Sequence, residues 1–162
     1  MKKASIVIID YGMGNIKSIY NALVRMGGNV STSRCIKDIL AADAIVLPGV
    51  GAFKEAMSNL KEFDLIEPII HAAKDQGKPL LGICLGMQLL ADNSDEHGYT
   101  KGLSLIPGSV KSIPAAPSLR LPHVGWNSLS ICRREALFAH MDEGNSVYFV
   151  HSYHFVCEKD YI

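Results

Sequence analysis

The order of apolar runs and helical patterns is the feature that most constrains the fold. Short apolar runs stand at residues 5–10 (SIVIID), 44–47 (AIVL) and 79–83 (PLLGI), with a more polar one at 29–33 (NVSTS). Continuous runs of this length are typical of strands buried on both faces. Because helical segments separate them, the sequence predicts βαβ units. The expected class is therefore α/β, with a doubly wound, mostly parallel sheet and helices on both faces.

The helical segments are expected near residues 16–26, 35–42, 53–60 and 65–76. After about residue 93 the pattern changes to strand-like, Pro/Gly-punctuated segments with one short helical piece at 134–140. These strand-like segments cover residues 103–113, 120–131 and 146–157. We expect them to be antiparallel or mixed and to join the same sheet, so that residues 1–162 form a single domain.

Composition narrows the classes of partner. A chain of 162 residues with 48% hydrophobic residues can bury one sizeable core, which excludes a disordered chain. Lys and Arg (16) balance Asp and Glu (16), so nucleic acid is a poor candidate partner. The apolar run near the start ends at Asp10, too early for a signal peptide, and no run is long enough to span a membrane. We expect a cytoplasmic protein with no membrane contact.

Cysteine and histidine spacing argues against disulfides and metal. The four cysteines are scattered without a CxxC pair, and the six histidines form no HxxxH or HExxH pattern, so no metal site is expected. The segment YGMGN (11–15) begins like a dinucleotide fingerprint, but Lys17 stands where glycine is needed. We therefore expect no cofactor.

Cys84 follows the run at 79–83 and lies between Gly82 and Gly86, in the order G-x-C-x-G. Ligands of open parallel sheets bind at the carboxyl ends of the strands, where this turn must lie. Glycines on both sides allow a nucleophile elbow, and the N–H groups of the following helix would favour a thiolate. A buried structural cysteine explains this short stretch equally well.

A second glycine turn, PGVG (48–51), ends a neighbouring strand. Its backbone N–H groups are unobstructed and able to face an oxyanion beside Cys84. In isolation a plain strand-to-helix turn is the better explanation. The two turns at one sheet edge together favour acyl-transfer chemistry.

Three motifs carry a family resemblance. PGVG, GICLGMQLL and PHVGWN, in this order and spacing, resemble the class I (triad) glutamine amidotransferases, and within them the glutaminase subunits of imidazole glycerol phosphate synthase. IDYGMGNIKS and YFVHSY fit the same group, so the resemblance covers essentially the whole chain. It implies a subunit that hydrolyses glutamine and supplies ammonia to a cyclase subunit of (β/α)8 fold, in a heterodimer serving histidine biosynthesis, without a cofactor.

The resemblance also implies roles for individual residues. Cys84 is the nucleophile. The oxyanion hole is formed by the backbone of Gly49, Val50 and Gly51, which is misoriented until the partner binds. Glutamine is held by Gln88, Glu96, His151 and Ser152, the last two through main chain. The partner surface includes Asn15, Pro122, His123 and Trp126, although Trp126 also fits an ordinary core position.

The sequence departs from the family at the catalytic base. The family takes its histidine and glutamate from an HPE motif, and this sequence contains none. His151 is the nearest histidine by pattern, but the resemblance places it in the glutamine-binding strand. We expect a C-terminally truncated copy that lacks the last strands, the final helix and the triad His and Glu, with very low turnover. The alternatives are a non-catalytic cyclase-binding subunit, an ammonia donor to a sugar-modifying synthase and, less well supported, a cysteine hydrolase or chaperone of the related α/β group.

Overall fold

The computed structural model describes residues 3–114, 120–133 and 136–161. Its largest element is a sheet whose four strands are parallel throughout, in the order β2-β1-β3-β4. The strands are β1 (Ser5–Ile9), β2 (Asn29–Ser33), β3 (Ala44–Leu47) and β4 (Leu80–Gly82). The α/β class and the parallel sheet predicted from the sequence are confirmed.

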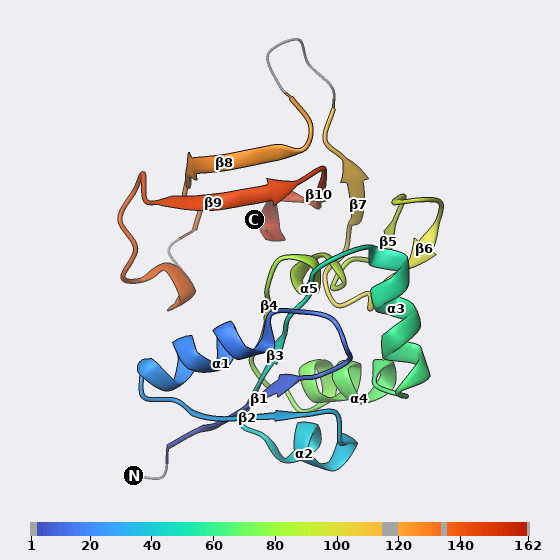
Figure 1. Cartoon of the computed structure of the whole chain (residues 1–162), viewed down its shortest axis with the longest axis vertical. Coiled ribbons are helices and arrows are strands. Elements are labelled where there is room, and N and C mark those ends of the chain that lie inside the picture. The colour runs from blue at the N-terminus through green and yellow to red at the C-terminus, as the bar shows by residue number, and fades with distance from the viewer. Residues whose placement is uncertain (1–2, 115–119, 134–135, 162) are drawn as a thin grey trace.

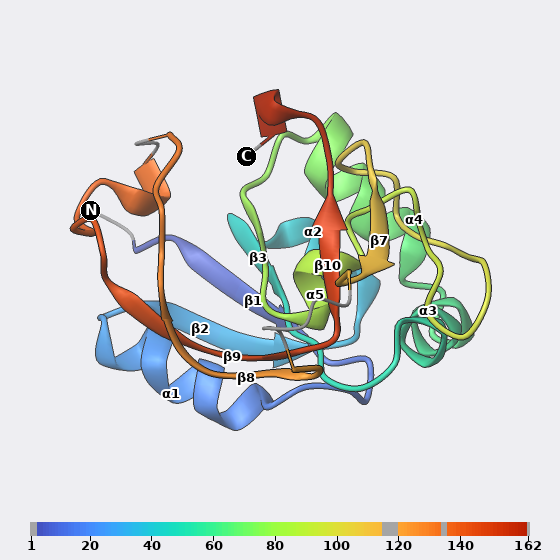
Figure 2. The same cartoon turned by 90° about the horizontal axis from the view of Figure 1, so that it is seen from above.

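Helices connect these strands. They are α1 (Ile16–Arg25), α2 (Ile36–Ala41), α3 (Phe53–Glu62), α4 (Ile66–Ile70) with a π-helical continuation (His71–Asp75), and α5 (Leu85–Gln88). Right-handed crossovers in this strand order place α1 on one face of the sheet and α2, α3 and α4 on the other (Figures 1 and 2). The winding direction changes between β1 and β3, so their carboxyl ends form the topological switch point where ligands bind in such sheets.

The core lies between the sheet and the α3 face. The central strands bury Ile9 and Leu47 completely, and α3 adds buried residues at helical spacing: Phe53, Ala56, Met57 and Leu60. In contrast, α1 is amphipathic but buries none of its residues, and Tyr20 and Val24 on it are exposed. The α1 side of the sheet is therefore much more open than the α3 side.

The second half of the chain corrects one prediction. A mixed sheet in the order β10-β7-β5-β6 is separate from the first sheet, and β8 pairs with β9 as an antiparallel ribbon (Figure 1). The bounds are β5 (Asn93–Ser94), β6 (Thr100–Lys101), β7 (Ser109–Ser112), β8 (His123–Ser128), β9 (Ser146–His151) and β10 (Tyr153–Val156). The expectation that these strands join the first sheet is wrong.

The reason lies in the connection after β4. This strand has only three residues, and within the described residues it pairs with β3 alone. The chain then turns through α5 and folds back on it, where the Leu103 N–H donates to the Leu89 carbonyl at 2.9 Å. The later strands therefore start away from the free edge of the sheet.

The remaining described helical segments are short 3-10 turns. The sequence predicts a helix over 134–140; the structure has a 3-10 turn at Ala136–Phe138, and residues 134–135 lie outside the described part. A further 3-10 turn spans Lys159–Tyr161.

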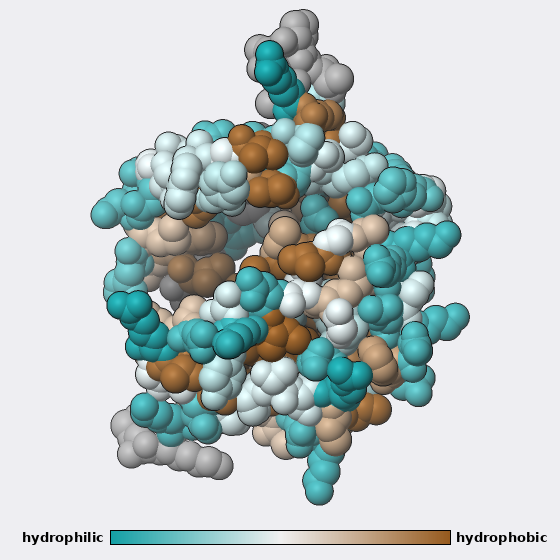
Figure 3. Space-filling view, viewed as in Figure 1, coloured by the Kyte–Doolittle hydropathy of each residue, from teal (hydrophilic) through white to brown (hydrophobic). Residues whose placement is uncertain are grey.

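Across the residues described, no helix has the length and apolar character needed to cross a membrane. Figure 3 shows that the face in view is hollowed between the ribbon and the parallel sheet, with hydrophobic residues around the hollow.

Candidate active site

The turn at Cys84 has the sharp strand-to-helix geometry expected of a nucleophile elbow. Cys84 has φ 55° and ψ −117°, a backbone conformation that is strained for a residue with a side chain, and its side chain is exposed. A Cβ at Gly82 would lie 2.5 Å from Met87 Cα, and one at Gly86 would lie 1.9 Å from the Leu47 carbonyl oxygen. Both glycines are therefore required by close backbone approaches.

The three turns that follow β1, β3 and β4 meet at the switch point. A Cβ at Gly49 would lie 2.7 Å from the amide nitrogen of Gly86, and one at Gly14 would lie 2.9 Å from Pro48 Cβ. The elbow, the PGVG turn and the YGMGN turn are thus in direct contact, as their positions in the sequence predict.

The PGVG turn carries unpaired backbone donors. Among the described residues, none accepts a hydrogen bond from the amide N–H of Gly49, Val50 or Gly51. Unpaired N–H groups beside a nucleophile are suited to receive an oxygen that becomes negatively charged during attack. The turn therefore keeps backbone donors available for the oxyanion role expected of it from the sequence.

A pocket of about 290 Å³ opens at Cys84. This volume is at the lower end of the range for small-molecule sites and suits a ligand of amino-acid size. The lining residues are Val50, Gly51, Cys84, Leu85, Gln88, Glu96, Val150, His151, Ser152 and Tyr153. All four residues expected to bind glutamine are among them.

Hydrogen bonds hold the polar side chains of this pocket in place. Glu96 Oε2 accepts from the N–H of Phe53 at 2.7 Å, and Gln88 Nε2 donates to the carbonyl of Tyr153 at 3.1 Å. Within the described part of the chain, Glu96 Oε1 and Gln88 Oε1 have no partner, so each side chain is anchored and still presents an oxygen.

Both ring nitrogens of His151 have hydrogen-bond partners. Its Nδ1 lies 2.9 Å from the Tyr153 carbonyl, which only accepts, so Nδ1 carries the proton. Nε2 lies 3.0 Å from Nδ1 of His123, and the two nitrogens share one hydrogen bond. His151 is the only histidine of the described residues that lines the pocket, and neither of its nitrogens is free for the Cys84 proton.

The residues predicted for a partner surface lie outside the pocket. Asn15 is the N-cap of α1, where its Oδ1 accepts from the Ser18 N–H at 3.3 Å. Pro122 precedes β8, and His123 and Trp126 lie on it. Trp126 is 73% exposed, so its interpretation as an ordinary core residue is wrong.

Trp126 belongs to an exposed apolar strip on the ribbon. In the register of β8 and β9, Val124 faces Val150 and Trp126 faces Tyr148, and all four side chains are more than half exposed. Trp126 and Tyr148 meet edge-to-face, with ring centroids 5.6 Å apart. A contiguous apolar strip of this kind is typical of an interaction surface.

Tyr11 is a site residue that sequence reasoning missed. It is completely buried, and its hydroxyl donates to the Pro48 carbonyl at 2.7 Å. Burial, and secondarily the nearby Cys84, raises the pKa of Tyr11 above its ordinary value, so the phenol remains a donor. The sequence placed Tyr11 in the correct turn, but no local pattern indicated that its side chain points inward.

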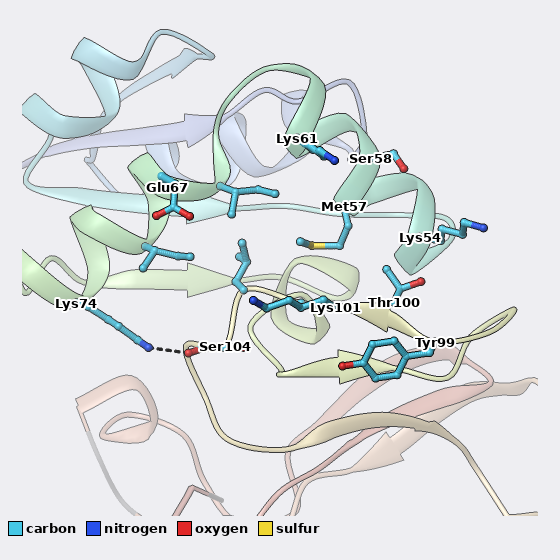
Figure 4. Close-up of a pocket in the computed structure, with 14 residues that line it drawn as sticks. Lys54, Met57, Ser58, Lys61, Glu67, Lys74, Tyr99, Thr100, Lys101 and Ser104 are labelled. Atoms are coloured by element: carbon cyan, nitrogen blue, oxygen red, sulfur yellow. Dashed lines mark hydrogen bonds between the residues drawn. The ribbon is translucent and has the colours of Figure 1, made fainter.

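A larger cavity, of about 680 Å³, lies elsewhere (Figure 4). It lies between α3, α4 and residues 99–104 and shares no lining residue with the Cys84 pocket. Four exposed lysines belong to its lining: Lys54, Lys61, Lys74 and Lys101. Only Lys74 has a fixed partner among the described residues, the Ser104 carbonyl at 2.7 Å. Solvated lysines of this kind define no ligand geometry.

The described residues also contain no cluster of three or more His, Cys, Asp or Glu able to hold a metal ion.

Comparison with known proteins identifies the family to which this sequence is similar. Residues 7–160 match the family described as "Glutamine amidotransferase class-I". The imidazole glycerol phosphate synthase subunit HisH of Listeria innocua is 49% identical over 157 residues, which cover 97% of this chain and 74% of that protein. The HisH subunit of Geobacter sulfurreducens is 46% identical, over 92% of this chain and 73% of that protein.

Solved structures share the fold. A crystal structure of a glutamine amidotransferase superposes with a TM-score of 0.73 at 16% identity, covering 94% of this chain and 75% of that chain. A glutamine amidotransferase from Thermotoga maritima gives a TM-score of 0.61 at 19% identity, covering 98% and 65%.

Proposed function

Because the chain belongs to the class-I glutamine amidotransferase family, in the group of HisH subunits, we propose that it is the glutaminase subunit of an imidazole glycerol phosphate synthase. It would hydrolyse glutamine to glutamate and supply ammonia to a cyclase subunit in histidine biosynthesis. The observation that carries this proposal is that the PGVG turn lies against the Cys84 elbow and that Val50 and Gly51 line the pocket with Cys84, while the N–H groups of residues 49–51 lack an acceptor among the described residues.

The reaction follows from the groups in the pocket. The Cys84 thiolate attacks Cδ of glutamine, a C–S bond forms, and the carbonyl electron pair moves to the oxygen beside the PGVG turn. When the tetrahedral adduct collapses, the C–N bond breaks, and the nitrogen takes up a proton and leaves as ammonia. Water then hydrolyses the thioester, releasing glutamate and regenerating the thiol.

The substrate is oriented by the anchored side chains. Glu96 Oε1 pairs with the α-ammonium group of glutamine, and Gln88 Oε1 accepts a second hydrogen bond from the substrate. The Ser152 carbonyl is occupied by the N–H of Ile113 at 2.9 Å. The Ser152 N–H remains a main-chain group that this side of the pocket offers to the substrate.

The general base is proposed to come from outside the 162 residues, in a segment carrying the HPE motif of the family. Three observations support this. The sequence contains no HPE, and both ring nitrogens of His151 are engaged. The chain also matches only about three quarters of the length of its relatives. The 162 residues alone would then bind glutamine and present Cys84, with very slow turnover.

The partner is proposed to be a cyclase of (β/α)8 fold that docks on the exposed strip of the ribbon, giving a cytoplasmic heterodimer. The strip is apolar and close to the pocket, because Val150 belongs to the strip and also lines the pocket. Asn15 and Pro122 would lie at the margin of this contact.

Glutaminase assays of the 162-residue chain, and of a longer form extended by the HPE-containing segment of a HisH relative, test the proposal. The cyclase is added to each form. We expect glutamate release from the longer form and its loss in Cys84→Ala, with little release from the short form. Complex formation without Cys84-dependent hydrolysis in either form would instead identify a non-catalytic cyclase-binding subunit.

A further inference from the structure

We infer that Tyr11 is a positioning residue of the oxyanion turn: its buried hydroxyl fixes the Pro48–Gly49 peptide group, so that only the peptide groups after Gly49 are free to rotate. The inference rests on the proposed function, because that function gives the turn its role in receiving the oxyanion. It assigns a role to a side chain that makes no contact with substrate.

Tyr11 is itself firmly held. It follows β1 at the switch point and is fully buried. Its backbone carbonyl accepts from Nδ2 of Asn59 on α3 at 3.2 Å, while its hydroxyl donates to the Pro48 carbonyl at 2.7 Å. The side chain therefore links the end of one central strand to the turn that ends the next.

The first half of the PGVG turn is enclosed on several sides. A Cβ at Gly49 would lie 2.8 Å from the Tyr11 hydroxyl and 2.7 Å from the Gly86 nitrogen. Pro48 has no N–H and a fixed φ, so its carbonyl is the polar group by which this residue can be held. The Tyr11 hydroxyl donates a hydrogen bond to that carbonyl.

The second half of the turn is free by comparison. Val50 is 52% exposed, Gly51 has φ 93°, and the N–H groups of both lack an acceptor within the described residues. The C=O and N–H of one trans peptide point in opposite directions, so fixing the Pro48 carbonyl on Tyr11 directs the Gly49 N–H away from Tyr11. The direction of the Gly49 N–H is thus fixed, and any reorientation of the turn occurs at the Gly49–Val50 and Val50–Gly51 peptides.

The size of the effect follows from this arrangement. Removing an oxyanion-hole donor lowers the rate by about 10²–10³-fold. Tyr11→Phe would loosen one donor without removing it, so we expect a rate loss of about tenfold at saturating substrate, with unchanged half-saturation, since Tyr11 does not line the pocket.

The test uses the chloromethyl ketone analogue of glutamine, which needs no general base. The Cys84 thiolate displaces chloride: a C–S bond forms, the C–Cl bond breaks and chloride leaves, while the ketone oxygen carries partial negative charge beside the turn. For Tyr11→Phe we expect the maximal inactivation rate to fall about tenfold with the half-saturating concentration unchanged. Iodoacetamide, which engages no oxyanion hole, should alkylate Cys84 at a rate within about twofold of wild type.

Tyr99→Phe is the matched control, because Tyr99 is exposed and lies outside the Cys84 pocket. Equal maximal inactivation of wild type and Tyr11→Phe would overturn the inference. A wild-type chain that shows no saturable inactivation would instead count against the proposed glutaminase.

A measurement on the unaltered chain covers the case in which Tyr11→Phe does not fold. Backbone ¹⁵N relaxation should show the Gly49 amide as rigid as the core strands and the Val50 and Gly51 amides as mobile. A Gly49 amide as mobile as that of Val50 would contradict the inference.

Discussion

At the scale of single residues, close backbone approaches build the site more than long side chains do. Cys84 adopts a positive φ, and Gly49, Gly82 and Gly86 lie where any Cβ would collide with neighbouring atoms. The strain at Cys84 is maintained because the surrounding turns leave the backbone no other course. The site is therefore sensitive to the addition of a single methyl group.

Gly86→Ala tests this sensitivity. The new Cβ would lie 1.9 Å from the Leu47 carbonyl oxygen, which is backbone and cannot rotate away. We expect the free energy of unfolding to fall by about 3 kcal/mol, the upper end for overpacking, and Cys84 to lose saturable inactivation by the chloromethyl ketone. Urea denaturation and the inactivation assay measure the two effects.

Gly77→Ala is the control for Gly86→Ala. Gly77 has φ 62° but no atom within 4 Å of the added Cβ, so only backbone strain is introduced. The cost should be about 1 kcal/mol, with inactivation unchanged. If Gly86→Ala behaved like Gly77→Ala, the close approach would not control the elbow.

At the scale of elements, the ribbon and the glutamine pocket are connected. His123 on β8 contacts His151 on β9, and His151 holds the Tyr153 carbonyl to which Gln88 also donates. This chain of hydrogen bonds runs from a strand of the proposed partner surface to a side chain of the pocket. We therefore expect the position of β8 to influence the shape of the pocket.

His123→Ala tests that connection. It removes the hydrogen-bond partner of His151 Nε2 and the stacking of the His123 ring on Phe149, whose centroids are 5.0 Å apart. One net hydrogen bond corresponds to about 0.5–1.5 kcal/mol, so we expect the Kd for glutamine to rise about 2–10-fold. Calorimetry in the Cys84→Ala background measures binding without turnover.

Asn127→Ala is the matched control on the same strand, at an exposed position that pairs with Val147. It should leave the Kd unchanged. Equal affinities for His123→Ala and Asn127→Ala would mean that the ribbon and the pocket are energetically independent.

The sequence predicts this architecture unevenly, for physical reasons. The parallel strands, the elbow at Cys84 and its contact with the PGVG turn follow from apolar runs and glycine spacing, which are local signals. The separate second sheet depends on how the chain folds back after β4, and the inward direction of Tyr11 depends on tertiary packing. Neither leaves a periodic pattern in the sequence.

At the scale of the whole molecule, two of the exposed apolar surfaces of the described residues bear on association. The α1 face buries no residue, with Tyr20 and Val24 exposed, and the ribbon exposes its strip of Val124, Trp126, Tyr148 and Val150. Apolar surfaces of this kind are typical of association sites. The ribbon is the one proposed for the cyclase because it leads into the pocket.

Trp126 provides a direct test of this assignment, because it is the only tryptophan in the sequence and is 73% exposed. In the free protein we expect the emission of a solvent-exposed indole, readily quenched by acrylamide. Binding of the cyclase should desolvate the ring, shift its emission to shorter wavelength and reduce quenching, with a tryptophan-free cyclase used as titrant.

Val124→Asp, which places a charge in the strip, should weaken the complex by at least about tenfold. Val156→Asp, at an exposed position on β10, should not. A complex that forms without changing Trp126 emission would place the cyclase on another face, and the α1 face would then be the next surface to test.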